Sequence, residues 1–359
     1  MRLTGLPSLS ICILTYFLAP CLAAEEFVWT FAVSGDSRNC GDVVMPAIAR
    51  GAETNQAAFY WHLGDFRAIY RFDQDYAQIH KPAHPQDALS ISTYLASAWQ
   101  DFIDDQLSSF GKTPVYLAFG NHELIPPLTR PQLIAQFADW LDAPAIRQQR
   151  LRDDPHDHTV KGYYHWMEDG IDFITMDNAS PDEFDQLQMG WIESVLSHDA
   201  EDTSVRAVIA GMHEALPNSL SADHSMNQSA QGTQSGERVY GWLLDFKKKS
   251  GKPVYVLASH SHFYMDGIFN TDYWRAHGGV LPGWIIGTAG AERRALPADA
   301  NEANEAKAHV YGYLLATVTG NKENPVHFQF KQLSESDVPA DVTRRFTPEF
   351  VHSCWIGNP

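Results

Sequence analysis

Short apolar and β-branched runs alternate with segments of helical periodicity along most of this sequence. Seven runs have the composition of buried strands, and several of them end in glycine, asparagine or histidine. We expect strands at residues 27–34, 57–63, 114–119, 171–176, 205–211, 253–259 and 284–288. We expect amphipathic helices over residues 94–110, 187–196 and 239–246. Strands that alternate with helices predict an α/β fold and argue against an all-β shell.

The composition is typical of a folded chain with a large core. Its 359 residues are 44% hydrophobic and 12% aromatic, which suits one elaborated domain or two modest ones. Acidic residues number 44 against 26 basic ones, so we expect no nucleic-acid-binding face, which is normally basic. Two polar segments, 124–162 and 215–236, are expected to be long loop insertions that shape a substrate pocket. The Asp- and His-rich stretch 153–158 is interpreted as hydrated loop.

The N-terminus has the pattern of a secretory signal peptide. Arg2 precedes an apolar run that ends in small residues around Ala23 and Ala24. The run falls short of the roughly 20 residues that a membrane-spanning helix needs, and no later segment reaches that length. We therefore expect residues 1–24 to be removed, leaving a secreted or periplasmic chain without a transmembrane segment. A membrane span, or a lipoprotein anchor at Cys21, is the alternative.

Removal of this leader would leave two cysteines, Cys40 and Cys354. An oxidising compartment favours a disulfide between them. The bond would tie a C-terminal tail, residues 334–359, to the loop after the first strand of a main domain that spans residues 25–333. Two unpaired, buried cysteines are the alternative.

A polar cluster follows each of five predicted strands. The clusters are Gly35-Asp36-Ser37-Arg38, Gly64-Asp65-Phe66-Arg67, Gly120-Asn121-His122-Glu123, Gly211-Met212-His213-Glu214 and Ser259-His260-Ser261-His262. Open α/β sheets place their ligands at the carboxyl ends of strands. Carboxylates, an amide oxygen and imidazoles are donors that hold Mn, Fe or Zn, and a carboxylate shared by two cations suits the hydrolysis of phosphate esters. The clusters together predict a metal centre.

In their order, these clusters resemble the five sequence blocks of the calcineurin-like metallophosphoesterase superfamily, over residues 27–330. Gly120-Asn121-His122-Glu123 and Ser259-His260-Ser261-His262 are the most specific part of the resemblance. It implies a sandwich of two mixed β-sheets flanked by helices. It also implies a small phosphorylated substrate and one or two divalent or trivalent metal ions, Mn, Fe or Zn.

Carried over by position, the resemblance makes six residues metal ligands: Asp36, Asp65, Asn121, His213, His260 and His262. Asp65 would bridge two ions, and three others, Asn121, His213 and His260, would complete one site. The remaining two would belong to the second site.

His122 would not bind metal. It would stabilise the phosphoryl oxygens or protonate the leaving alkoxide, a task that suits an imidazole near neutral pH. Its neighbour Glu123 would orient the loop.

One position departs from the family pattern, because Arg38 stands where the first block normally has a metal-binding histidine. A guanidinium is permanently charged and cannot be a ligand. The site would then be a dimetal centre with one ligand supplied from elsewhere, or a single-metal site. We interpret Arg38 as a substrate-binding residue, with an ion pair to a nearby carboxylate as the alternative. The tyrosine of the purple acid phosphatase branch is also missing, since Ala68 occupies its position.

The expected function is that of an exported, metal-dependent phosphoric ester hydrolase, specifically a phosphomonoesterase. A metal-bound hydroxide would attack phosphorus in line while His122 assists the leaving group. A phosphodiesterase of the same superfamily and a catalytically impaired metal- or phosphate-binding protein are the alternatives. The sequence sets no oligomeric state.

Overall fold

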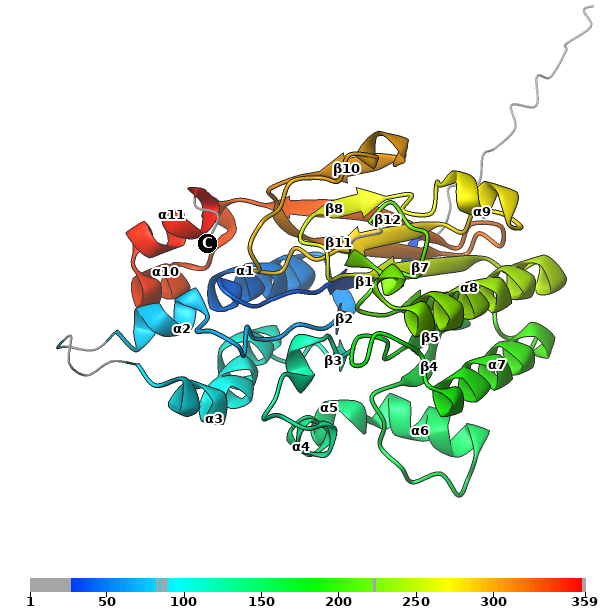
Figure 1. The fold of residues 1–359 in the computed structure, drawn as a ribbon, viewed down its shortest axis with the longest axis horizontal. Helices are drawn as coiled ribbons and strands as arrows, with labels where there is room; N and C mark the ends of the chain where they lie inside the picture. Colours follow the sequence, from blue (N-terminus) through cyan, green and yellow to red (C-terminus); the bar gives the residue numbers. More distant parts are fainter. Residues whose placement is uncertain (1–26, 82–83, 85–88, 222–223, 357–359) are drawn as a thin grey trace, which may run out of the picture.

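Two mixed β-sheets stacked between helices make up the described part of the chain, which confirms the expected α/β sandwich (Figure 1). The computed structural model describes residues 27–81, 84, 89–221 and 224–356. The signal peptide expected at residues 1–24 lies outside them. Within these ranges, no helix combines the length and the apolar character that crossing a membrane requires.

The first sheet has five strands in the order β12-β11-β1-β2-β3. Strands β1 (Phe27–Ser34), β2 (Ala57–His62) and β3 (Val115–Leu117) are parallel to one another. Strands β11 (Tyr311–Thr319) and β12 (Val326–Leu333) form an antiparallel hairpin whose first strand pairs with β1. This hairpin is not among the strands expected from the sequence, although residues 326–333 alternate polar and apolar side chains as a half-buried strand does.

The second sheet has seven strands in the order β10-β8-β9-β7-β6-β5-β4. They are β4 (Tyr164–Glu168), β5 (Ile171–Thr175), β6 (Ala207–Gly211), β7 (Val254–Ala258), β8 (Tyr264–Asp266), β9 (Gly283–Ile286) and β10 (Glu305–Lys307). Strands β5, β6, β7 and β9 are parallel, while β4 and β8 pair antiparallel with their neighbours. All seven predicted strands are present in the two sheets.

An aromatic core joins the facing sides of the two sheets. Phe31 of β1 stacks on Phe59 of β2 at 5.0 Å between ring centroids, and it also meets Phe173 of β5 edge to face at 5.1 Å. The next residue of β5, Ile174, points to the opposite side, into a second apolar core under the outer helices. This packing holds the carboxyl ends of both sets of parallel strands at fixed positions.

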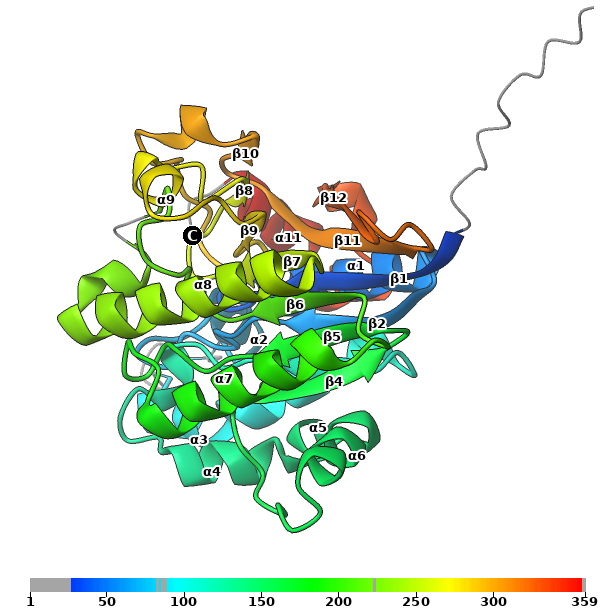
Figure 2. The ribbon, with the colours of Figure 1, turned by 90° about the vertical axis from the view of Figure 1, so that its right-hand side faces the viewer.

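Helices cover both outer faces of the sandwich. Helix α1 (Gly41–Thr54) contacts the first sheet, and α7 (Gln186–Glu201) and α8 (Ala230–Ser250) cover the second (Figures 1 and 2). Both α7 and α8 extend beyond the predicted 187–196 and 239–246. A capping side chain accepts a backbone N–H at the start of each: Asp185 accepts from Gln188 in α7, and Ser229 accepts from Gly232 in α8.

The predicted helix at 94–110 is present but irregular. Helix α3 (Ile91–Asp101) continues through a π-helical turn (Phe102–Gln106) into a 3-10 turn (Leu107–Phe110). The π-helical turn carries Gln106, whose amide donates to Asp42 Oδ1 at 2.9 Å. Two further short helices are α2 (Gln74–Ile79) and α9 (Asp272–Ala276).

The segment 124–162, expected as a loop, is mostly helical. It contains α4 (Arg130–Gln136), α5 (Ala138–Leu141) and α6 (Pro144–Asp153). The sequence holds local signals for two of these starts, because Thr129 and Gln132 form a capping box and Pro144 opens the first turn of α6. The other segment expected as a loop, 215–236, ends in the first residues of α8, which begins at Ala230.

The C-terminal segment expected as a tail forms two helices, α10 (Ala340–Phe346) and α11 (Pro348–Ile356). Helix α10 contacts α1. Cys354 of α11 is bonded to Cys40, which immediately precedes α1, so the structure contains the predicted disulfide.

Candidate metal centre

The predicted site residues follow the carboxyl ends of parallel strands in both sheets. Those of the first sheet come after β1, β2 and β3, and those of the second come after β6 and β7. The structure brings together eight residues named from the sequence: Asp36, Arg38, Asp65, Asn121, His122, His213, His260 and His262.

Left-handed backbone turns aim several of these side chains inward. Asp36, Asp65 and His260 have φ values of 60°, 60° and 64°, a region that non-glycine residues rarely adopt and that is found at functional sites. At Gly64, with φ 95°, a Cβ atom would lie 2.5 Å from the backbone nitrogen of Gly120. Glycine at this position therefore lets the loops after β2 and β3 touch.

Four donor atoms converge around His213. Its Nε2 lies 3.3 Å from Asp65 Oδ1, 3.0 Å from His260 Nδ1 and 3.2 Å from Asn121 Oδ1. Its Nδ1 must carry hydrogen, because it is 2.8 Å from the carbonyl oxygen of Leu63, which can only accept. In its neutral form, His213 presents the lone pair of Nε2 to the three other ligand atoms. Burial lowers the pKa of His213, but the charges of Asp65 and Asp36 outweigh burial and raise it.

This donor set fits a metal ion. Ligand atoms of Asp65, His213 and His260 all lie within 4.8 Å of one another. Burial lowers the pKa of His260 to about 3, so its imidazole is neutral and able to coordinate. Lone pairs this close repel one another unless a cation or proton lies between them, and mixed imidazole and oxygen donors suit Zn, Mn or Fe.

Asp36 and His262 form the second part of the predicted metal centre. His262 Nε2 lies 3.3 Å from Asp36 Oδ1, and its Nδ1 donates to the carbonyl oxygen of Glu292 at 2.7 Å. The other carboxylate oxygen of Asp36 accepts the hydroxyl of Ser259 and the backbone N–H of His260. The side chain of Ser259 thus holds Asp36 in position.

Arg38 lies beside this second part. Its Nη2 donates to His262 Nε2 at 2.9 Å and its Nη1 donates to His122 Nε2 at 2.9 Å. Its Nε is 3.8 Å from Asp65 Oδ2, so the ion pair considered from the sequence is present. Contact between Arg38 and a substrate stays a prediction.

His122 lies beside Asp65, but its side chain is not one of the convergent ligand atoms. Its Nδ1 donates to the carbonyl oxygen of Ala68 at 2.7 Å, and its Nε2 is 3.6 Å from Asp65 Oδ2. Burial lowers the pKa of His122, and the charge of Arg38 lowers it further while Asp65 opposes both. The exposed ring of Tyr70 lies 5.2 Å from the imidazole, between centroids.

The carboxylate of Glu123 ties the loops together, as expected from the sequence. It accepts backbone N–H groups from Gly120 at 2.6 Å, from Phe66 at 2.7 Å and from Asp65 at 3.0 Å. Burial raises the pKa of this carboxyl group to about 7.

Two residues come to the site from distant segments and were not expected there from the sequence. The ring of His224 lies 5.5 Å from that of His260, and Arg294 lies 3.2 Å from His224, between side-chain nitrogens. Neither residue belongs to a recognisable motif, so only the fold reveals their proximity.

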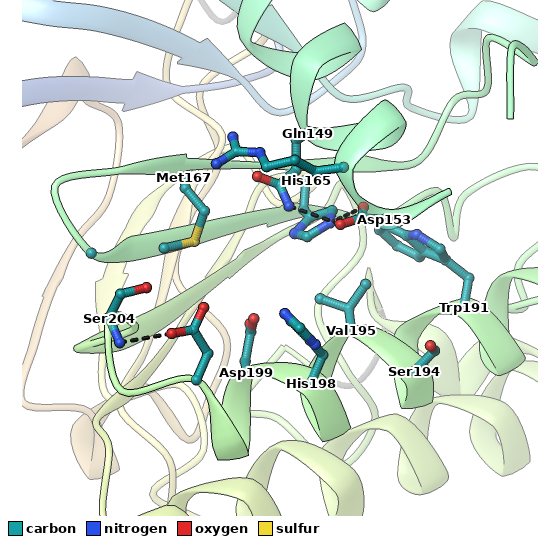
Figure 3. Close-up of a pocket in the computed structure, with 13 residues that line it drawn as sticks. Gln149, Asp153, His165, Met167, Trp191, Ser194, Val195, His198, Asp199 and Ser204 are labelled. Carbon is teal, nitrogen blue, oxygen red and sulfur yellow. Dashed lines mark hydrogen bonds and ion pairs between the residues drawn. The ribbon is translucent and has the colours of Figure 1, made fainter. Parts of the chain in front are cut away.

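A separate cavity of about 520 Å³ lies between α6, β4 and α7, away from the donor set. Figure 3 shows Asp153 and His165 pointing toward each other on one side of it, with His198 and Asp199 of α7 on the other. His165 is 2.7 Å from Asp153 and 2.8 Å from Asp172. Asp153, assigned to a hydrated loop from the sequence, therefore forms an ion pair at the end of α6.

Comparison with known proteins identifies the class. The family model described as "Calcineurin-like phosphoesterase" matches residues 30–264, more than half of the chain. The chain therefore belongs to the calcineurin-like phosphoesterase family, as the sequence blocks predicted. It is a metal-dependent phosphoesterase, a phosphoric ester hydrolase.

One solved structure shares the fold at low sequence identity, and a second is similar more weakly. A structure titled "Structure of PhoD" has a TM-score of 0.52 at 15% identity, covering 93% of this chain and 78% of that chain. A structure of GAP50, the anchor in the inner membrane complex of Plasmodium, has a TM-score of 0.46 at 11% identity, covering 93% of this chain and 96% of that chain. No curated protein sequence matches the chain.

Proposed function

We propose that this chain is an exported phosphomonoesterase. The observation that carries the proposal is the convergence of Asp65, Asn121, His213 and His260 directly beside His122 and Arg38. A metal ion held by the first four residues would activate water near neutral pH and neutralise charge on the phosphoryl oxygens.

Arg38 favours a monoester because of its charge. The terminal phosphate of a monoester carries up to two negative charges, and a diester carries one. The guanidinium is permanently positive and can donate two N–H groups to phosphate oxygens. Arg38 thus adds a fixed positive charge where the extra negative charge of a monoester would lie.

His122 would deliver a proton to the leaving group from Nε2. In the structure, this atom accepts a hydrogen bond from Arg38. A phosphoryl oxygen that takes over the N–H of Arg38 would release Nε2, and its negative charge would favour the protonated imidazole. His122 Nδ1 would keep its bond to the carbonyl oxygen of Ala68, which fixes the ring orientation.

Export is supported by the leader pattern of residues 1–24 and by the Cys40–Cys354 bond, since disulfides persist in oxidising compartments. Intact-mass measurement of protein recovered from the producing cells tests this. A chain lacking the leader and containing no free thiol supports export. A reduced chain that retains residues 1–24 contradicts it.

Purified protein loaded with Mn²⁺, Zn²⁺ or Fe²⁺ tests the activity. We expect a higher kcat/KM for p-nitrophenyl phosphate than for bis(p-nitrophenyl) phosphate, with loss of turnover in His122→Ala and normal turnover in His198→Ala. A preference for the diester would identify a phosphodiesterase.

The contact between Arg38 and His262 also fits a catalytically impaired phosphate-binding protein. Calorimetric titration with inorganic phosphate, alongside the activity assay, separates the two functions. Phosphate binding by metal-loaded protein without turnover of either ester would favour the binding protein and reject the phosphomonoesterase.

A further inference from the structure

We propose that the guanidinium of Arg38 takes the place of a second metal ion, so that the site holds one metal ion beside a cation built into the chain. The proposal rests on the proposed function for its purpose, since both cations would face the same phosphoryl group. Its structural basis is independent of any substrate.

Arg38 occupies the one lone pair that His262 could offer to a metal ion. Nδ1 of His262 carries hydrogen, because it is bonded to the carbonyl oxygen of Glu292. Nε2 therefore has a single lone pair, and the Nη2–H of Arg38 occupies it at 2.9 Å. One imidazole nitrogen cannot accept this hydrogen bond and coordinate a metal ion at the same time.

Few ligands are left for a second metal ion. If His262 is not a ligand, the second metal site has two predicted ligands left, Asp36 and one oxygen of Asp65. Among the described residues, no hydrogen-bond donor reaches the two remaining oxygens, Asp36 Oδ1 and Asp65 Oδ2. Arg38 supplies a positive charge here, with its Nε 3.8 Å from Asp65 Oδ2.

The guanidinium of Arg38 is a buried positive charge with a fixed position. Arg38 is 6% exposed, and its two terminal nitrogens are fixed by His262 and His122. A guanidinium stays positive at any physiological pH, so it repels a metal ion at the second site beside Asp36 and His262. Two cations with separate positions then flank Asp65, one exchangeable and one permanent.

Arg38 makes no hydrogen bond or ion pair to the ligand atoms that converge around His213, among the described contacts. Arg38 contacts His122, His262 and Asp65 Oδ2, whereas the convergent cluster uses Asp65 Oδ1 with Asn121 and two other histidines. Asp65 thus presents one oxygen to each cation, as a bridging carboxylate does between two metals.

Metal stoichiometry tests the proposal without any substrate. Protein saturated with Mn²⁺ and freed of excess metal is measured by elemental analysis and by electron paramagnetic resonance. We expect one ion per chain and the spectrum of an isolated Mn²⁺. Arg38→His should bind two ions and give the spectrum of a coupled pair.

Arg206→His is the matched control, because it adds a histidine at the start of β6, at the opposite end of the strand from the site. It should keep one ion. Two ions in the unaltered chain, or none, would overturn the proposal even if Arg38→His fails to fold. One ion without phosphatase turnover would reject the proposed function and leave the assignment of Arg38 standing.

Discussion

The carboxylate of Glu123 accepts the backbone N–H of Asp65 at 3.0 Å, which fixes the residue that faces both halves of the site. The side chain of Asp65 in turn accepts the backbone N–H of His122 at 3.1 Å. The loops after β2 and β3 therefore hold each other in place through buried hydrogen bonds. The position of Asp65 is set by the protein before a metal ion binds.

Replacing Glu123 by Gln should loosen this arrangement. The amide group of Gln would direct N–H groups at backbone N–H groups, and each buried donor left unpaired costs about 1–3 kcal/mol. Urea denaturation should show a loss in that range, and Mn²⁺ affinity should fall about 10–100-fold, as for other residues that orient ligands. Glu193→Gln, at an exposed position of α7, is the control. Unchanged Mn²⁺ affinity in the Glu123 variant would contradict the positioning role.

Asp65→Asn should remove metal binding and turnover together. The substitution keeps the shape of the side chain but removes a charge that faces His213 Nε2 at 3.3 Å. We expect the affinity for Mn²⁺ to fall more than about 100-fold, beyond the usual effect of residues outside the ligand shell. Calorimetric titration measures this directly, with the exposed Asp245→Asn as control. Metal binding that survives in Asp65→Asn would remove this residue from the ligand set.

Breaking the Cys40–Cys354 disulfide should destabilise the chain. The bond joins residues 314 positions apart and ties α11 to the start of α1, so its loss frees the C-terminal helices in the unfolded and partly unfolded chain. We expect a loss of about 2–5 kcal/mol in the free energy of unfolding when reductant is added. The double variant Cys40→Ser, Cys354→Ser should start at this lower value and show no further response to reductant. Equal stability with and without reductant in the unaltered chain would be inconsistent with the bond.

The parts of the site that the sequence predicted share one property: they are local to strand ends. Each block, such as Gly64-Asp65 or Gly120-Asn121-His122, follows an apolar run that is recognisable by itself. Parallel strands then bring the blocks to one edge, so the ligand cluster could be predicted without knowing the pairing order.

Features that depend on distant pairing could not be predicted in this way. The strand β11 pairs with β1 across almost the whole chain, and nothing local specifies this partner. Arg38 contacts His262, which is 224 positions away, and the sequence allowed several partners for it. The helices of 124–162 were missed for a different reason, since their short length gives little apolar periodicity.

Stability should fall with rising pH through the ion pairs of His165. Burial lowers the pKa of this histidine, but the carboxylates of Asp172 and Asp153 outweigh it and raise the pKa to about 10. A raised pKa means that the stabilisation is complete below the unfolded pKa of about 6.5 and is lost as pH rises toward 10. We expect a decline of about 1.4 kcal/mol per pH unit in this window.

Urea denaturation at several pH values between 6 and 10 measures this decline. Because other groups also titrate, the comparison is between the unaltered chain and His165→Asn, which should have a flatter profile. His158→Asn, at an exposed position of the same region, should keep the original slope. Identical slopes in the unaltered chain and His165→Asn would show that His165 is not a buried imidazolium.

We propose that this chain hydrolyses phosphate monoesters with one bound metal ion. Metal-free protein titrated with Mn²⁺, with p-nitrophenyl phosphate turnover and bound metal measured at each point, tests it most directly. Turnover should start near zero, rise with bound metal and level off at one ion per chain. Protein that binds its metal ion and still leaves the monoester intact would contradict the claim.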